Sequence, residues 1–383
     1  MTHITHAASV RDGIDIAFGG TPHGATPAGV THVFTYAWLR DHCACAECRH
    51  PDTQQRLLDT FALPKDLAVT ALELGAGGRT LSLTWPDGHQ SHFAAADLAD
   101  SLLPVGILSS EIKSWNDAEI AVDFPQVTYE ALMGDDAVLE AYLEKIERHG
   151  FCFVEETPAT PEATKAVANR IAYIRKTIFG SYWDFTANMA HKDTAYTSLA
   201  IGPHTDGTYS FDAPGYQMFH CLGVDCVGGE NVFVDGFRIA EITKRETPDL
   251  YRILTEVDVP GQYIDHEKGI HLMARRPLLR LDSTGRLAQV SFNNHDRAPF
   301  ALEPARMAKF QEAYAAFAAH ANDRALQYRR RLLPGSVVLF DNWRLLHARD
   351  AYSGYRRLAG AYLNKEDVES RLRVLRLKKA QAA

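Results

Sequence analysis

A histidine and an aspartate stand two residues apart in the segment HTDGTY, and this pair limits the folds open to the chain. Alternate side chains of an extended segment point the same way, so His204 and Asp206 can face one point. Two ligands do not complete a metal site, and His347 in LFDNWRLLH is the candidate for the third. Two histidines and one carboxylate on one side of a metal leave open positions, as in non-heme Fe(II) oxygenases. The fold would have to bring these distant segments together.

The segment YRRLAGAYLN, which follows His347, favours a metal site over the alternative of a structural core histidine. If it is a strand, one face carries Arg356, Leu358, Gly360 and Tyr362. Gly360 would keep that face open. A buried guanidinium needs a carboxylate partner, because an unpaired buried charge is costly. A dicarboxylate such as 2-oxoglutarate would supply it, with one end on iron and the other on Arg356.

The periodicity of the chain indicates strands that are spread around a few helices. Apolar residues recur at helical spacing in residues 129–150, 160–178, 249–259 and 304–323. Strand-like segments are residues 151–156, 216–222, 231–237, 287–294, 336–341 and 356–364. Non-local strands of this kind argue for a mainly β fold, a sandwich or jelly-roll barrel with flanking helices, rather than a βαβ sheet.

The first hundred residues look like a separate, small β-rich module. They carry strand-like residues 32–39 and 80–85, Gly-rich turns and no long helical periodicity. Cys43, Cys45 and Cys48 crowd together there, and His89 and His92 lie on the next β-rich stretch. Three thiolates and one imidazole would close a tetrahedral structural zinc site, although spacing does not choose between the two histidines. Unligated thiols or a redox pair are the alternatives.

Composition argues against some partners and locations. The net charge of −8 and pI near 6.1 do not supply the basic face that a nucleic acid needs. Apolar runs fall short of the roughly 18 residues of a membrane span. The start of the chain lacks the pattern of a secretion signal or transit peptide, so we expect a cytoplasmic protein.

Eight segments, in order along nearly the whole chain, then point to one family. They are WLRDHC, DTAYT, HTDGTY, FHCL, VDGF, FNNHDRA, DNWRLLHAR and SGYRRLAGAYL. In these segments the chain resembles the Fe(II)- and 2-oxoglutarate-dependent dioxygenases of carnitine biosynthesis, which act on γ-butyrobetaine and trimethyllysine. The resemblance implies a double-stranded β-helix, an iron site at His204, Asp206 and His347, and Arg356 as the 2-oxoglutarate anchor.

The same resemblance extends to the rest of the molecule. It implies a structural zinc held by Cys43, Cys45, Cys48 and His89, and ascorbate as a reductant. We expect a zinc-binding N-terminal domain over residues 1–105 and a dioxygenase domain over residues 125–383. The family precedent also suggests a homodimer.

The resemblance further suggests an aromatic cage for a trimethylammonium group, which cation–π attraction would stabilise. The matching positions are Phe179, Trp183, Tyr196 and Tyr362. Both relatives place Tyr where this chain has Phe179, which offers a π face without a hydroxyl. Taken singly, any of these aromatic residues would more commonly be a core residue.

Asp193 bears on which of the two substrates is bound. The resemblance places Asp there in the trimethyllysine enzyme and Asn in the γ-butyrobetaine enzyme. A carboxylate would attract the α-ammonium of trimethyllysine and repel the carboxylate of γ-butyrobetaine. Asn293 or Asn294 could then receive the amino acid's carboxylate, unless Asp193 only caps a turn.

We therefore expect a trimethyllysine dioxygenase. A γ-butyrobetaine dioxygenase is the alternative within the family. A catalytically silent module that binds methylated ammonium groups is the alternative from another class. The intact set of His204, Asp206 and Arg356 argues against that module, because a pure binder does not need all three.

Overall fold

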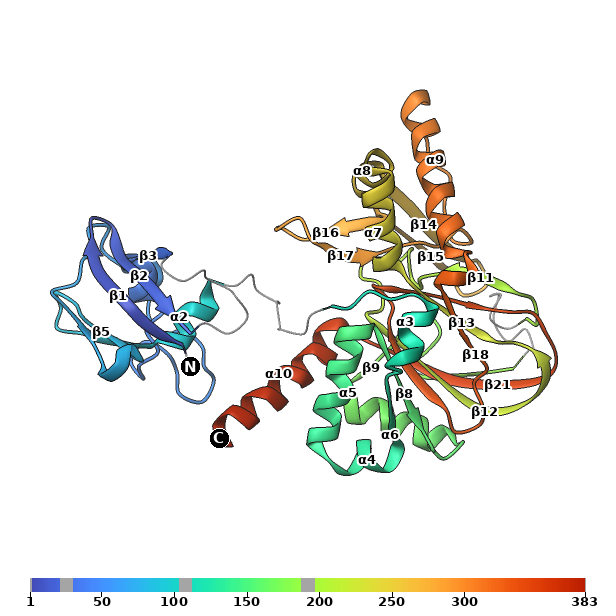
Figure 1. Cartoon of the computed structure of the whole chain (residues 1–383), viewed down its shortest axis with the longest axis horizontal. Coiled ribbons are helices and arrows are strands. Elements are labelled where there is room, and N and C mark those ends of the chain that lie inside the picture. Colours follow the sequence, from blue (N-terminus) through green and yellow to red (C-terminus); the bar gives the residue numbers. More distant parts are fainter. Residues whose placement is uncertain (1, 21–29, 103–111, 187–196, 383) are drawn as a thin grey trace. The chain divides into compact units, whose positions relative to one another are not determined.

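The computed structural model describes residues 2–20, 30–102, 112–186 and 197–382. Its contacts divide the chain into two compact units, Met1–Ser109 and Ser110–Ala383 (Figure 1). Each unit has its own buried cluster of apolar side chains. Residues 112–124, which lie outside both expected domains, belong to the second unit, where Trp115 is buried.

The first unit consists of two antiparallel three-stranded sheets and short helices. One sheet contains β1 (His3–Val10), β2 (Gly13–Gly19) and β3 (Thr31–Thr35), and the other contains β4 (Ala71–Leu74), β5 (Thr80–Thr84) and β6 (Gln90–Ala94). The helices are α1 (Tyr36–Asp41) and α2 (Ala95–Ser101), with 3-10 turns at Thr60–Ala62 and Ala76–Gly78. The expected strand over residues 32–39 is wrong in its second half. Thr35 accepts a hydrogen bond from the Trp38 backbone N–H and so starts α1.

The second unit is built on two sheets. The larger has the order β10-β21-β12-β19-β8-β7, with β9 also paired to β21, and the smaller has the order β11-β20-β13-β18. The larger sheet comprises β7 (Gln126–Thr128), β8 (Phe151–Glu155), β9 (Ile174–Arg175), β10 (Trp183–Phe185), β12 (Tyr216–Gly228), β19 (Val337–Asp341) and β21 (Tyr352–Leu363). The smaller comprises β11 (Ile201–His204), β13 (Asn231–Asp235), β18 (Gln327–Arg330) and β20 (Leu345–Arg349).

An aromatic cluster joins the inner faces of these two sheets. Phe233 of the smaller sheet packs on Phe340 and Phe151 of the larger, with ring centroids 5.2 and 5.8 Å apart. Neighbouring strands within each sheet are antiparallel, except for the parallel pair β7 and β8. The fold is thus mainly β with flanking helices, as the sequence predicted.

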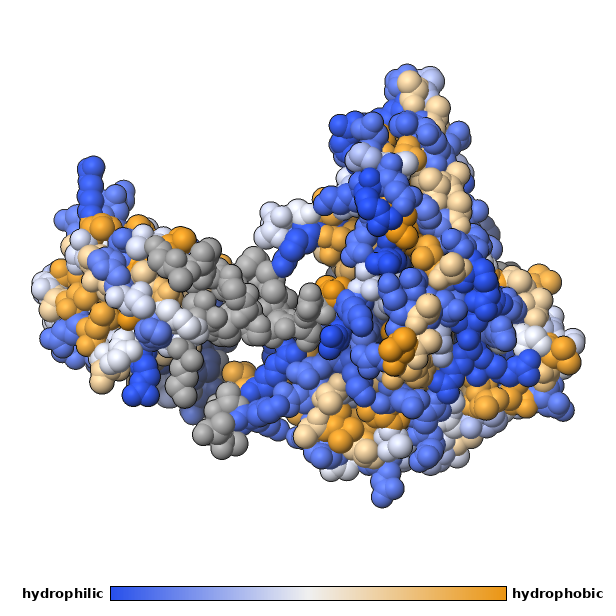
Figure 2. Space-filling model, in the orientation of Figure 1, coloured by the Kyte–Doolittle hydropathy of each residue, from blue (hydrophilic) through white to orange (hydrophobic). Residues whose placement is uncertain are grey.

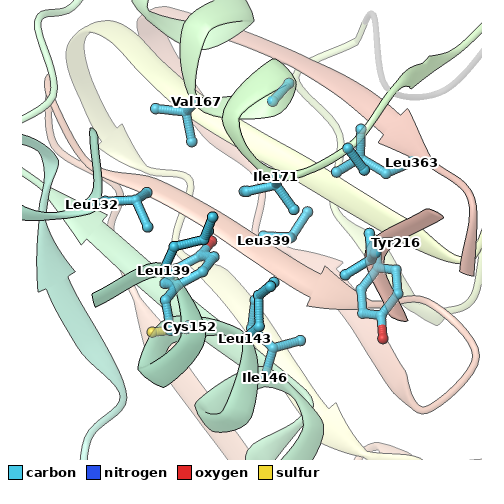
Figure 3. Close-up of a cluster of buried hydrophobic side chains, with 14 of the residues drawn as sticks. Leu132, Leu139, Leu143, Ile146, Cys152, Val167, Ile171, Tyr216, Leu339 and Leu363 are labelled. Carbon is cyan, nitrogen blue, oxygen red and sulfur yellow. The ribbon is translucent and has the colours of Figure 1, made fainter. Parts of the chain in front are cut away.

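Helices cover the two sheets on their outer sides. Around the larger sheet lie α4 (Tyr129–Gly134), α5 (Asp136–His149), α6 (Pro161–Ile171) and α10 (Lys365–Ala382). The short helix α3 (Asp117–Val122) contacts β18 of the smaller sheet. Figure 3 shows Leu143 and Ile146 of α5 and Ile171 of α6 meeting Leu339 of β19. Next to the smaller sheet lie α7 (Gly236–Glu246), α8 (Pro248–Glu256) and α9 (Pro304–Ala321). Two hairpins, β14 (Asp258–Asp265) with β15 (Ile270–Pro277) and β16 (Leu279–Leu281) with β17 (Leu287–Val290), and a 3-10 turn at Arg324–Leu326 complete the unit.

Three expected helices differ from the observed ones. The helix expected over residues 249–259 ends at Glu256, since Asp258 and Val259 pair with β15. Residues 129–150 form two helices, because Asp135 has extended backbone and its side chain caps Ala137 at the start of α5. The helix expected over residues 160–178 ends at Ile171, since Ile174 and Arg175 pair with β21 instead. Within the described residues, no helix is both long and apolar enough to cross a bilayer. Hydrophilic residues cover much of the visible surface (Figure 2).

Candidate active site and zinc cluster

Strand pairing brings the two predicted metal-binding histidines together. His204 ends β11 and lies opposite His347 of β20, with ring centroids 4.2 Å apart. His204 Nε2 lies 3.3 Å, and His347 Nε2 3.8 Å, from Asp206 Oδ1. All three side chains offer donor atoms within 4.8 Å of one another. The sheet register therefore assembles the triad from segments that are distant in sequence.

Asp206 reaches this point in a different way from the one expected. It lies in the turn after β11, so strand alternation with His204 does not place it. Instead, the Asn342 side chain holds its backbone: Asn342 Oδ1 accepts from Asp206 N at 2.8 Å, and Asn342 Nδ2 donates to Asp206 O at 3.0 Å. The same Nδ2 also donates to Pro214 O at 2.9 Å. A buried amide thus fixes the turn that presents the carboxylate.

The protonation of the triad suits a divalent metal. His204 Nδ1 lies 2.8 Å from Gly202 O, so Nε2 is the ring nitrogen that faces Asp206. Burial would lower the pKa of His204, but Asp206 and the Gly202 carbonyl outweigh it and raise the pKa, so a metal would replace a proton at Nε2. Burial and the neighbouring His204 lower the pKa of His347 to about 3, so its imidazole is neutral. Burial alone would raise the pKa of Asp206, but His347 and His204 outweigh it and lower the pKa. Three electron-pair donors converge on one point, and a cation such as Fe(II) would satisfy them.

Arg356 is buried in the same cavity with its charge incompletely neutralised. The residue is 6% exposed, and its guanidinium donates to Asn231 Oδ1 at 3.0 Å. Burial and the nearby Arg349 lower its pKa to about 10. No carboxylate in the described part of the chain forms an ion pair with it. A dicarboxylate ligand would provide the missing partner.

These groups line one cavity of about 470 Å³. Its aromatic lining residues are Phe179, Trp183, Phe185, Tyr209, Phe219, Tyr263 and Tyr362. The Trp183 and Tyr362 rings meet edge to face, with centroids 5.7 Å apart. The expectation from the sequence that Gly360 keeps its face of the strand open is wrong. A Cβ added there would lie 2.2 Å from the Trp183 ring and 2.0 Å from Met218 O, so the glycine is the floor on which Trp183 packs.

The predicted polar substrate residues divide into three groups. Asn293 lines the cavity, and its Nδ2 donates to Asp296 Oδ2 at 2.8 Å. Asn294 is exposed and is not among the lining residues. Asp193 and the cage candidate Tyr196 lie outside the described residues.

The first unit holds the second predicted metal cluster. His89 Nε2 lies 3.3 Å from Cys43 Sγ and 3.6 Å from both Cys45 Sγ and Cys48 Sγ. Zinc bonds of about 2.3 Å to sulfur and 2.0 Å to nitrogen would put S and N about 3.5 Å apart in a tetrahedron. The four donors therefore fit Zn²⁺. His92 instead bonds Ser82 Oγ at 2.9 Å, which removes the choice that spacing left open.

Two further side chains support this cluster. Arg40 is 7% exposed and its Nη1 donates to Cys48 Sγ at 3.1 Å. Three thiolates around Zn²⁺ leave one net negative charge, which Arg40 would balance. Glu47 Oε2, on an exposed side chain, lies 3.4 Å from His89 Nδ1, the ring nitrogen that does not face the thiols. Neither residue was assigned a role from the sequence, although Arg40 lies inside the segment WLRDHC and Glu47 directly precedes Cys48.

Comparison with known proteins agrees with this geometry. Residues 112–362 match the taurine catabolism dioxygenase TauD, TfdA family, and residues 26–98 match the γ-butyrobetaine hydroxylase-like N-terminal family. The trimethyllysine dioxygenase of Meyerozyma guilliermondii is 34% identical, over 91% of this chain and 92% of that protein. This chain belongs to the TauD, TfdA dioxygenase family.

Other relatives of this dioxygenase carry both names that the resemblance suggested. The mitochondrial trimethyllysine dioxygenase of Homo sapiens is 35% identical over 90% of this chain and 83% of that protein. The γ-butyrobetaine dioxygenase of Pseudomonas sp. strain AK-1 is 32% identical over 98% of this chain and 97% of that one. The predicted family and the predicted enzyme class, a 2-oxoglutarate-dependent dioxygenase, are confirmed.

Several residues of the dioxygenase site escaped the sequence analysis. Gln217 lies on β12 opposite Tyr362 of β21, is 3% exposed and lines the cavity, and its Oε1 accepts no hydrogen bond from the part of the chain that the structure describes. Asp296 and Arg349 also line the cavity. Strand alternation from Phe219 could have placed Gln217 on the inner face. The same argument from His347 could have placed Arg349, which is the last residue of the segment DNWRLLHAR.

Proposed function

We propose that this enzyme hydroxylates Nε-trimethyllysine with Fe(II) and 2-oxoglutarate. The observation that carries the proposal is that one cavity contains the convergent donor triad, the buried Arg356 and an aromatic wall. Each of the three fits one of the required ligands: the metal, the dicarboxylate and the quaternary ammonium. A protein that only bound methylated ammonium groups would not need the first two.

The protein groups bind and orient the reactants. His204, Asp206 and His347 would hold Fe(II), which when bound supplies oxygen activation coupled to oxidative decarboxylation of 2-oxoglutarate. Arg356 would bind the distal carboxylate and so fix the position of the cosubstrate. In the overall reaction, one atom of O₂ enters a substrate C–H bond and the other enters succinate, while carbon dioxide leaves. The protein selects the C–H bond by position.

The aromatic wall would hold the trimethylammonium group. Trp183 and Tyr362 line the cavity, and Phe179 packs edge to face on Tyr263, with centroids 5.9 Å apart. A desolvated cation over such rings gains about 2 kcal/mol or more. The apolar wall also excludes water from the reacting carbon. We keep Tyr196 as a fourth cage residue on the basis of the sequence.

The choice of trimethyllysine over γ-butyrobetaine is supported by a carboxylate in the cavity wall. Asp296 lines the cavity beside Asn293. Its charge would attract an α-ammonium group and disfavour a substrate that ends in a carboxylate alone. Asp193 would act in the same direction. The alternative of γ-butyrobetaine hydroxylation is favoured by the 32% identical relative of that name, which spans nearly the whole chain.

Zinc in the Cys43, Cys45, Cys48 and His89 cluster is also part of the proposal, with a structural role because four protein donors leave no open position. Ascorbate as reductant, a homodimer and a cytoplasmic location stay predictions. Several of the relatives are described as mitochondrial.

Succinate formation by the Fe(II)-loaded protein tests the proposed substrate. We expect kcat/KM to be higher with Nε-trimethyllysine than with γ-butyrobetaine, and Asp296→Asn to lower that ratio by about tenfold, or about 1.4 kcal/mol. Asn294→Ala, an exposed neighbour, should leave the ratio unchanged, and Asp193→Asn tests the carboxylate inferred from sequence. A preference for γ-butyrobetaine would support the alternative. Absence of succinate with both compounds would favour the alternative of a catalytically silent module that binds methylated ammonium groups.

A further inference from the structure

The hydroxyl of Tyr362 contacts a metal-binding residue. Tyr362 OH donates to Asp206 Oδ2 at 2.7 Å, and the side chain is only 8% exposed. The other carboxylate oxygen, Oδ1, faces His204 Nε2 at 3.3 Å and His347 Nε2 at 3.8 Å. The two oxygens of Asp206 therefore have different partners: one belongs to the donor triad and the other to the tyrosine.

This division fixes the rotation of the carboxylate. Asn342 holds the Asp206 backbone but makes no contact that sets its terminal torsion, and carboxylate torsions of this sp³–sp² kind are broad. A hydrogen bond to an ionised carboxylate is strong and directional. With Oδ2 held by the tyrosine, Oδ1 stays aimed at the point where the imidazoles converge. Binding of the metal through both oxygens is disfavoured at the same time.

Tyr362 is itself held rigidly enough to do this. It lies inside β21, paired with Gln217 of β12 on one side and Arg175 of β9 on the other. Its ring packs edge to face against Trp183. Both the backbone and the ring are thus fixed before the hydroxyl meets Asp206. The ring faces the substrate cavity while the hydroxyl reaches the metal triad.

We propose that Tyr362 is a positioning residue for the metal, whose hydroxyl orients Asp206 for binding through Oδ1, in addition to forming part of the aromatic wall. The proposal rests on the metal site of the proposed function. It separates two roles of one side chain: the ring would contribute to substrate affinity and the hydroxyl to metal affinity. Removal of partners of this kind commonly weakens metal binding by about 10- to 100-fold.

The decisive variant is Tyr362→Phe, which keeps the ring and removes only the hydroxyl. Metal affinity is measured by titrating the full-length protein with Mn²⁺, without cosubstrate or substrate, so that the result does not depend on turnover. We expect the Kd for Mn²⁺ to rise by about 10- to 100-fold. The visible absorption of bound Co²⁺ should also change, because the carboxylate can turn. The KM for Nε-trimethyllysine, measured at saturating metal, should change little.

Tyr263→Phe is the matched control, because it removes a hydroxyl from another tyrosine of the same cavity. Its Kd for Mn²⁺ and its Co²⁺ spectrum should equal those of the unmodified protein, and thermal unfolding of both metal-free variants checks that they fold. An unchanged Kd and Co²⁺ spectrum in Tyr362→Phe, or equal losses in the two variants, would overturn the inference. If the unmodified protein binds no Mn²⁺, the proposed metal site itself fails, which is a distinct outcome.

Discussion

Arg356 shows how a single buried side chain limits the choice of ligand. Its guanidinium is almost fully buried, receives no carboxylate from the described residues and has its pKa lowered by burial and by Arg349. A buried, unpaired cation is energetically costly unless a bound ligand supplies a carboxylate to pair with it. The two arginines together form the positively charged part of the cavity wall, which suits a dianion better than a neutral cosubstrate.

Replacing Arg356 by Gln should therefore act on the cosubstrate. Losing one partner of a buried charge pair costs about 2–5 kcal/mol, so the KM for 2-oxoglutarate should rise about 30-fold or more. The KM for Nε-trimethyllysine, measured at saturating 2-oxoglutarate, should change far less. Kinetics with each compound varied in turn provide the measurement. An unchanged KM for 2-oxoglutarate would show that another group anchors it.

For single residues, the sequence is informative where the side-chain type alone indicates the chemistry. His204, Asp206 and His347 could be found because few side chains bind metals and their pattern is specific. Asn342 and the hydroxyl of Tyr362 act on Asp206 only through hydrogen bonds, and those bonds depend on the tertiary arrangement of the strands, which no local pattern specifies. Amides and tyrosines are also too common for their type to point to a site.

Among the elements, the strand β21 contributes three side chains to the cavity. Arg356, Leu358 and Tyr362 alternate along its inner face and all line the cavity, as the sequence predicted for this segment. Sequence did not predict that β10 lies against β21 and places Trp183 over Gly360, because the pairing partner of an edge strand is a tertiary property. The helix break at Asp135 has a local cause, an N-cap, which the two consecutive aspartates of GDD could have indicated.

The contact between Gly360 and Trp183 predicts a strong effect from one methyl group. In Gly360→Ala the new Cβ would overlap Met218 O and the Trp183 ring, and overpacking of this kind costs about 1–3 kcal/mol. We expect a lower free energy of unfolding in urea and a higher KM for the substrate, since Trp183 must move. Gly134→Ala, where a Cβ meets nothing within 4 Å, is the control and should not be destabilised. Equal stability of the two variants would contradict the packing argument.

For the whole molecule, metal binding is expected to stabilise the first unit. Its core is small, and four zinc donors come from two segments around α1 and the β5–β6 hairpin. Removing zinc with a chelator should therefore increase cleavage of Met1–Ser109 in limited proteolysis. Cys43→Ser should do the same, whereas Cys226→Ser, a thiol outside the cluster, should not. Equal resistance of the chelated and zinc-bound protein would argue against a structural zinc.

The stability of the second unit should depend on pH through His220. This side chain is fully buried, its Nδ1 bonds Thr164 Oγ1 at 2.7 Å, and burial lowers its pKa from 6.5 to about 4. The unfolded chain then binds more protons than the folded one, so stability is fully present above about pH 6.5 and declines as pH falls toward 4. In His220→Gln this part of the decline should disappear, as urea unfolding at several pH values would test. An unchanged slope would contradict the assignment.

The central claim is that the metal triad, Arg356 and the aromatic wall each bind one reactant within the same cavity. Product analysis under ¹⁸O₂ tests this claim most directly. The Fe(II)-loaded protein is given 2-oxoglutarate and Nε-trimethyllysine, and both products are analysed by mass spectrometry. The account predicts equal amounts of succinate and hydroxylated trimethyllysine, with one labelled oxygen atom incorporated into each. Unmodified trimethyllysine, with or without succinate, would contradict it.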